Sequence, residues 1–160
     1  MPTTFAVDDL DHAVGSPLGV SPWRTVDQER IARFALATDD DQWIHTDPVR
    51  AAQGPFGSAV AHGLLTLSLL PAMAAEVYTV TGAAGRVNYG YERVRFPAPV
   101  RAGSRVRDRI VLDAVDHLPG AVRLRATHTV EIDGGSARPA SRSRSPSSSS
   151  MPHERQPARR

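Results

Sequence analysis

The spacing of apolar residues changes once along this chain, near Tyr78, and this change limits the fold more than any other feature. Before Tyr78, apolar residues recur every three or four positions, which is typical of helices with a buried face. After it, apolar and polar residues alternate, which is typical of strands that bury one side. Helices followed by neighbouring strands predict an α+β domain with an antiparallel sheet.

Two helices are expected early in the chain. Thr25 and Gln28 fit a capping box, so the first helix should run from Thr25 to about Ala37. Asp47 stands before a proline, which marks the start of a short second helix that ends at Ala52. The residues between these helices should be irregular.

The third predicted helix, from about Val60 to Val77, is the most apolar segment of the chain. Its leucines surround more than one face, so we expect it to be buried on most sides. Pro71 should bend it, because proline lacks the backbone N–H that a helix interior needs. This helix is the element around which the sheet can wrap.

Strands are predicted over 86–96, Val106–Val115 and Val122–Ile132. The last two are the longest, and the segment Asp116–Gly120 between them contains Pro-Gly, which is typical of a hairpin turn. Two long strands joined by a hairpin predict the centre of the sheet.

The composition changes after Gly135. Six Arg and one Glu give residues 136–160 a charge of +5, and the net charge of +2 leaves −3 for residues 1–135. This Ser/Arg/Pro-rich tail has no Val, Ile, Leu or aromatic residue, so it cannot bury enough surface to order itself. We therefore predict one folded domain over 1–135 and a disordered tail over 136–160.

Several protein classes are excluded at this stage. The chain has no cysteine, so disulfide scaffolds, thiolate metal sites and cysteine nucleophiles are excluded. The apolar run Ala59–Ala75 is interrupted by His62, Gly63 and Pro71, and it is shorter than a membrane span. The first residues show no signal peptide, and we expect a cytoplasmic protein with no membrane contact.

Catalytic chemistry is expected between the first two helices, in the segment ATDDDQWIHTDPVRAA. Asp40 and His45 are five residues apart there, and a carboxylate and an imidazole that meet at one water can move its protons. A solvated turn with a packing histidine would have the same spacing. Farther on, a first-turn backbone N–H at Gly63 could donate to a developing oxyanion, although close packing would also explain this glycine, and His62 could be an ordinary buried histidine.

Three separated blocks resemble one known family: DDDQWIHTDPVRAA, the His-Gly pair at 62–63, and VRFPAPVRAGSRV. The chain is similar here to the MaoC-like dehydratases, the (R)-specific enoyl-CoA hydratases of the hotdog fold. In their motif, Gly-Asp-x-Asn-Pro-Ile-His followed by x-Asp, the matching positions hold Asp40, Ile44, His45 and Asp47. Gln-Trp in place of Asn-Pro resembles the single-hotdog members of actinobacteria.

The resemblance implies a hotdog fold, with an antiparallel sheet wrapped around a long central helix, in a homodimer. It implies that Asp40 and His45 add water syn across trans-2-enoyl-CoA to give (R)-3-hydroxyacyl-CoA, with Asp40 as general base. It also implies that the Gly63 amide holds the thioester oxygen and that Gln42 orders the water or the dyad. The CoA thioester would be a substrate, and we expect no cofactor and no metal, since no third ligand has suitable spacing.

Two departures from the family pattern stand out. Asp39 replaces the motif glycine, which would be strained if that position needs a positive φ. The family's final strand follows the part that matches Ser136–Ala140, and the Ser/Arg/Pro tail stands in its place.

Three alternatives remain open. A hotdog thioesterase would carry a different motif, and a non-catalytic acyl-binding protein would not need both Asp40 and His45. The basic tail could bind nucleic acid through phosphates, but it lacks aromatic residues for base stacking and the rest of the chain is acidic. We therefore expect no nucleic-acid partner.

Overall fold

The computed structural model describes residues 1–135 and the backbone of residues 143–147. Its elements in chain order are β1 (Thr3–Ala6), a 3-10 helix (Val7–Ala13), β2 (Pro17–Val20), β3 (Arg24–Val26), α1 (Gln28–Thr38), α2 (Trp43–Thr46), α3 (Pro48–Ala52), α4 (Gly63–Ser68), α5 (Leu70–Val77), β4 (Tyr78–Thr81), β5 (Ser104–Leu118), β6 (Ala121–Ile132) and β7 (Ser143–Ser147). Within the described ranges, no helix has the length and apolar character of a membrane span. Within the tail that was predicted to be disordered, residues 143–147 form β7 and pair with β6; residues 136–142 and 148–160 lie outside the described residues, and their disorder stays a prediction.

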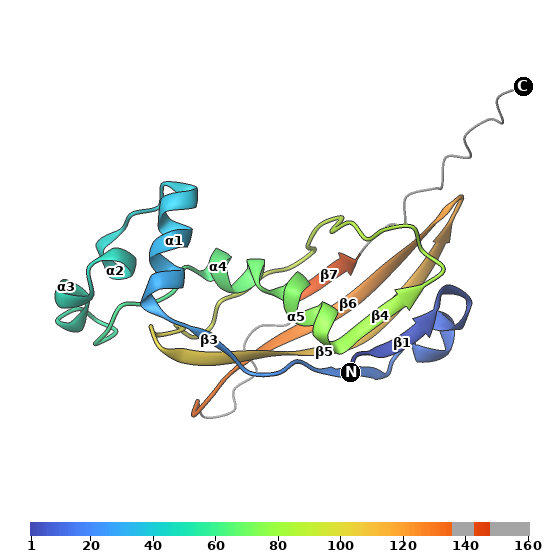
Figure 1. The fold of residues 1–160 in the computed structure, drawn as a ribbon, viewed down its shortest axis with the longest axis horizontal. Coiled ribbons are helices and arrows are strands. Elements are labelled where there is room, and N and C mark those ends of the chain that lie inside the picture. Colours follow the sequence, from blue (N-terminus) through green and yellow to red (C-terminus); the bar gives the residue numbers. More distant parts are fainter. Residues whose placement is uncertain (136–142, 148–160) are drawn as a thin grey trace, which may run out of the picture.

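A sheet of five strands is built around the long hairpin of β5 and β6. Its order is β2-β5-β6-β7, with antiparallel pairing throughout, and β3 also pairs with β5. β1 and β4 form a separate parallel pair. In Figure 1, α4 and α5 lie along the sheet, whereas α1, α2 and α3 gather beyond one end of it. The α+β prediction is confirmed.

Both long strands were predicted correctly, and each extends farther toward the turn than expected. The turn contains only Pro119 and Gly120, and Gly120 has a φ of 73°, which favours glycine. Side chains of α5 pack against the core-facing side of this hairpin, in a cluster that includes Ala74, Val77, Ile110, Leu112, Leu124 and Ala126.

The predicted helix over 60–77 is two shorter helices, and the prediction of one continuous helix was wrong. The chain bends at Leu69, two residues before Pro71, so the proline stands in the first turn of α5, where no N–H is needed. Residues 60–62 are not helical, because Val60 forms a β-bridge with Arg101.

The start of the first helix also differs from the prediction. Thr25 belongs to β3, and Asp27 caps α1 by accepting a hydrogen bond from the Arg30 amide at 2.8 Å. The predicted cap of the second helix is confirmed, since the Asp47 carboxylate accepts from the Arg50 amide at 3.0 Å.

The alternating residues of 86–96 form no continuous strand, contrary to the prediction. A strand needs a neighbour for its backbone hydrogen bonds, and no ladder between the described strands includes this segment. Its apolar residues Val87, Tyr89 and Phe96 are exposed. Alternation of apolar and polar residues is therefore not enough to predict that a segment pairs with a neighbouring strand.

One polar residue from each long strand interrupts the apolar core. The Asp108 side chain on β5 is fully buried, and its Oδ2 lies 2.6 Å from Nδ1 of the buried His128 on β6. Burial raises the pKa of the Asp108 carboxyl above its ordinary value of 3.8, and this effect exceeds the opposing effect of His128.

We expect the contribution of Asp108 to stability to fall as pH rises. Its folded-state pKa lies above the unfolded value of 3.8, so the folded protein keeps this proton at pH values where the unfolded chain has lost it. The free energy of unfolding then decreases with rising pH until the folded-state pKa is passed. Urea unfolding of wild type and Asp108→Asn across about pH 4 to 8 measures this. The difference, wild type minus variant, should fall; a flat or rising difference contradicts the assignment.

Candidate active site

The site begins where α1 ends, at a left-handed turn. Asp39 caps α1 with φ 56° and ψ 20°, and it is the non-glycine residue with positive φ in the described part of the chain. The position of the motif glycine therefore does need the left-handed region, as the sequence suggested. The turn leads into Asp40, whose side chain is 49% exposed.

His45 lies in α2, and three hydrogen bonds fix the position of His45 and of its neighbour Ile44. Its Nδ1 lies 2.6 Å from the Val60 carbonyl, and the Val60 amide donates to the Ile44 carbonyl at 3.0 Å. The Gln28 side chain donates to the His45 carbonyl at 2.7 Å. Since a carbonyl only accepts, Nδ1 carries a proton, and in the neutral ring the lone pair lies on Nε2.

Three polar groups meet beside this ring. A carboxylate oxygen of Asp40 and one ring nitrogen each from His45 and His62 all lie within 4.8 Å of one another. His45 and His62 are 8% and 3% exposed, and their rings stack with centroids 3.7 Å apart. The structure thus brings the predicted pair Asp40 and His45 together and adds His62.

A carboxylate and an unprotonated imidazole nitrogen at this spacing can hold one water and transfer its protons. The same three groups could be considered as metal ligands. A zinc-type ion would have to lie about 2.0–2.1 Å from each nitrogen, in the plane of each ring. The stacked rings are inclined by only 26°, so their in-plane lone pairs do not converge on one ion. The arrangement fits a water better than a metal.

Gly63 is the first residue of α4, where backbone amides have no partner within the helix. Among the described residues, no group accepts a hydrogen bond from this amide. A Cβ at this position would lie 2.6 Å from the Phe96 ring, so close packing also requires glycine. The structure therefore explains this glycine by close packing, and its role as an oxyanion donor stays a prediction.

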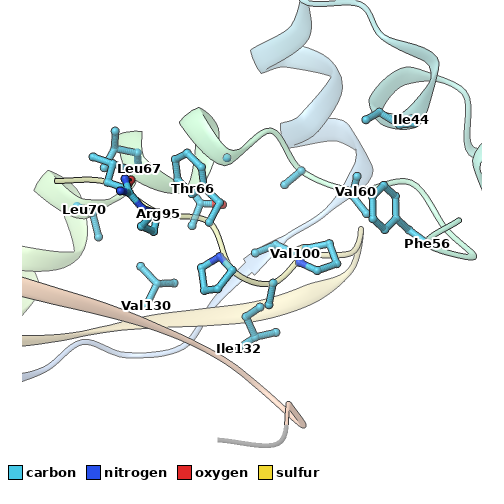
Figure 2. A pocket seen from close by; sticks show the side chains of 17 residues that line it. Ile44, Phe56, Val60, Thr66, Leu67, Leu70, Arg95, Val100, Val130 and Ile132 are labelled. Atoms are coloured by element: carbon cyan, nitrogen blue, oxygen red, sulfur yellow. The ribbon is translucent and has the colours of Figure 1, made fainter. Parts of the chain in front are cut away.

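An apolar cavity of about 390 Å³ is lined by Ile44 and Gly63, which directly adjoin His45 and His62 in the sequence; the side chains of Asp40, His45 and His62 are not among its lining residues. Figure 2 shows Ile44, Val60 and Phe56 at one end, Leu67 and Leu70 at the other, and Val130 and Ile132 of β6 along one side. Gly63 also lines it, so its amide and the cavity are adjacent. The volume is within the range of small-molecule sites.

Gln42 contacts the site through its backbone. Its carbonyl accepts from the His45 amide at 2.9 Å, but no described hydrogen bond joins its side chain to the dyad. Its role toward the water stays a prediction. Sequence reasoning missed Gln28 as a site residue and left His62 as a packing residue; the His-Gly pair was the available signal for His62.

Comparison with known protein families shows which family this chain belongs to. The family model described as "MaoC like domain" matches residues 9–132. The chain belongs to the MaoC-like dehydratase family. It is 50% identical over 141 residues to a protein from Mycobacterium tuberculosis named 3-hydroxyacyl-thioester dehydratase Z, covering 88% of this chain and 93% of that protein. This MaoC-like dehydratase is therefore an enzyme of the hydro-lyase class.

Solved structures confirm the hotdog fold of the dehydratase. The unliganded (R)-hydratase PhaJ1 from Pseudomonas aeruginosa superimposes with a TM-score of 0.66 at 23% identity, covering 88% of this chain and 83% of that one. The (R)-hydratase from A. caviae gives a TM-score of 0.66 at 22% identity, with coverages of 87% and 96%.

We expect Asp39→Gly to stabilise the dehydratase by up to about 1 kcal/mol, because glycine adopts the left-handed region without a Cβ clash. Thermal unfolding measures this as a rise of several degrees in Tm. The matched control is Asp41→Gly, two residues on, where φ is not positive and glycine only adds freedom to the unfolded chain. An unchanged or lower Tm for Asp39→Gly would show that the turn is not strained.

Proposed function

We propose that this MaoC-like dehydratase is an (R)-specific enoyl-CoA hydratase, which adds water reversibly to trans-2-enoyl-CoA to give (R)-3-hydroxyacyl-CoA. The observation that carries this proposal is that the Asp40 carboxylate lies within 4.8 Å of a ring nitrogen of His45, whose Nδ1 is already bonded to the Val60 carbonyl. The apolar cavity with the Gly63 amide in its wall supports it. The relatives support it too, because their names refer to a 3-hydroxyacyl-thioester and to (R)-hydratases.

The dyad would act on a single water. One hydrogen of the water points to the Asp40 carboxylate and the other to the Nε2 lone pair of His45. Asp40 takes its proton as the oxygen bonds to C3 of the enoyl chain, and the π electrons of the C2–C3 bond move toward the thioester carbonyl. The same proton then returns to C2, so the oxygen and the hydrogen add to one face. This is the syn outcome.

The thioester oxygen becomes enolate-like during this step and needs a hydrogen-bond donor. The Gly63 amide has no acceptor among the described residues, and Gly63 lines the cavity, so this amide is the candidate donor. These groups complete the reaction without a cofactor.

The acyl chain would occupy the apolar cavity, where Phe56, Leu67 and Leu70 contact it. The CoA part would extend outward past the exposed Asp40 side. A homodimer and a cytoplasmic location are part of this proposal.

The test is the loss of enoyl-thioester absorbance with crotonyl-CoA and a longer trans-2-enoyl-CoA, with product configuration read by an (R)- or (S)-specific dehydrogenase. Wild type should give the (R) product. Asp40→Asn and His45→Gln should each lower kcat by at least about 100-fold, because each removes a group that holds or accepts the water proton. Asp41→Asn is the control: it removes a neighbouring exposed carboxylate, and kcat should stay within about twofold.

Folding of each variant is checked by circular dichroism and thermal unfolding. An (S) product, or full activity in folded Asp40→Asn, would contradict the proposal. Release of free CoA thiol from acyl-CoA without hydration would instead support a thioesterase.

A further inference from the structure

His62 is a buried imidazole that contacts both residues of the proposed dyad. It caps α4, one residue before Gly63, and its ring stacks on His45. Phe34 lies against it as well, with ring centroids 5.1 Å apart. His62 therefore lies between Gly63, the proposed oxyanion donor, and the ring of His45.

The hydrogen bond of His62 fixes its protonation pattern. Its Nε2 lies 2.9 Å from the backbone carbonyl of Asp40, and a carbonyl only accepts, so Nε2 carries a proton. Its Nδ1 is buried and has no hydrogen-bond partner among the described residues. A proton on Nδ1 would be an unpaired buried donor, so the tautomer with its proton on Nε2 fits these contacts best.

The position of Asp40 depends on this bond more than on any other described contact. Its side chain is half exposed, and the nearest basic atom is His62 Nε2, 3.9 Å from Oδ2. The hydrogen bond from His62 Nε2 goes to the backbone carbonyl of Asp40 at 2.9 Å. His62 therefore anchors the backbone of the residue that carries this half-exposed carboxylate.

We propose that His62 is a positioning residue of the dehydratase, which fixes the Asp40 carboxylate relative to the His45 ring through one hydrogen bond and one stacking contact. The inference rests on the proposed function, because it assigns His62 a role in holding the two groups that share the water. His62 itself does not touch the reacting atoms. Its effect should therefore appear in kcat and hardly in KM.

Two substitutions separate the two contacts. His62→Phe keeps an aromatic ring against His45 but loses the N–H donor. His62→Gln loses the ring but places an amide N–H near the position of Nε2. If the bond to Asp40 does the positioning, His62→Phe should lower kcat about 10- to 100-fold with KM within about threefold, as for other groups that orient catalytic ligands. His62→Gln should recover most of that loss.

The matched control is His128→Asn, at another buried histidine, where the asparagine amide can still donate to Asp108. It should change Tm but keep kcat within about twofold. Imidazole ¹⁵N shifts of the wild type give a second measurement that needs no substrate. They should show His62 protonated on Nε2 and His45 protonated on Nδ1.

Unchanged kcat in folded His62→Phe would overturn the inference. So would equal losses in the Phe and Gln variants that scale with Tm, as they would for a core residue, or a His62 protonated on Nδ1. If His62→Phe does not fold, the inference is tested by two other measurements, the kcat of His62→Gln and the imidazole ¹⁵N shifts of the wild type. A kcat of His62→Gln more than about 10-fold below that of the wild type, or a His62 protonated on Nδ1, would then overturn it. A folded wild type without hydratase activity would defeat the proposed function first, and this inference with it.

Discussion

The hydrogen bond from His45 Nδ1 to the Val60 carbonyl, 2.6 Å long, is the contact on which the site depends. It determines which nitrogen of His45 keeps its lone pair, and it joins the helical end of the molecule to the sheet. The segment around Val60 continues the connection, because the Ala61 amide donates to the Val100 carbonyl at 2.7 Å and the Ala102 amide donates to Ala59 at 2.8 Å. The catalytic ring is thus tied to the backbone that leads into β5.

The two proposed catalytic groups lie in different environments, and this matches their different tasks. His45 is buried and held from three directions, so its ring can orient a water without moving. Asp40 is half exposed and follows a left-handed turn, so its carboxylate is open to substrate and depends on His62 for its place. Leaving any of these buried polar groups unpaired would cost about 1–3 kcal/mol, so the contacts also stabilise the fold.

Much of this arrangement could be predicted from the sequence because it depends on local spacing. The β5–β6 hairpin follows from alternation and a Pro-Gly turn, and the cap at Asp47 follows from one residue and the proline after it. The proximity of Asp40 and His45 could be predicted because they are only five residues apart, whereas their catalytic role stays a proposal. The strain at Asp39 was visible as a departure from the family motif.

The missed features depend on contacts between distant residues. Gln28 looked like part of a helix cap, but its side chain reaches a carbonyl seventeen residues later. His62 contacts Asp40 across twenty-two residues. Alternation in 86–96 does not reveal whether a neighbouring strand is present. Asp108 and His128 are buried at positions where the alternation of the two long strands predicts apolar residues.

The central claim is that one water, held between Asp40 and His45, supplies both the oxygen and the proton. Hydration of crotonyl-CoA in D₂O tests this most directly, with the configuration at C2 and C3 of the product read by proton NMR. The account predicts one deuterium at C2, on the same face as the new hydroxyl, in a product that is (R) at C3. Deuterium on the opposite face, or spread equally over both faces, would contradict it.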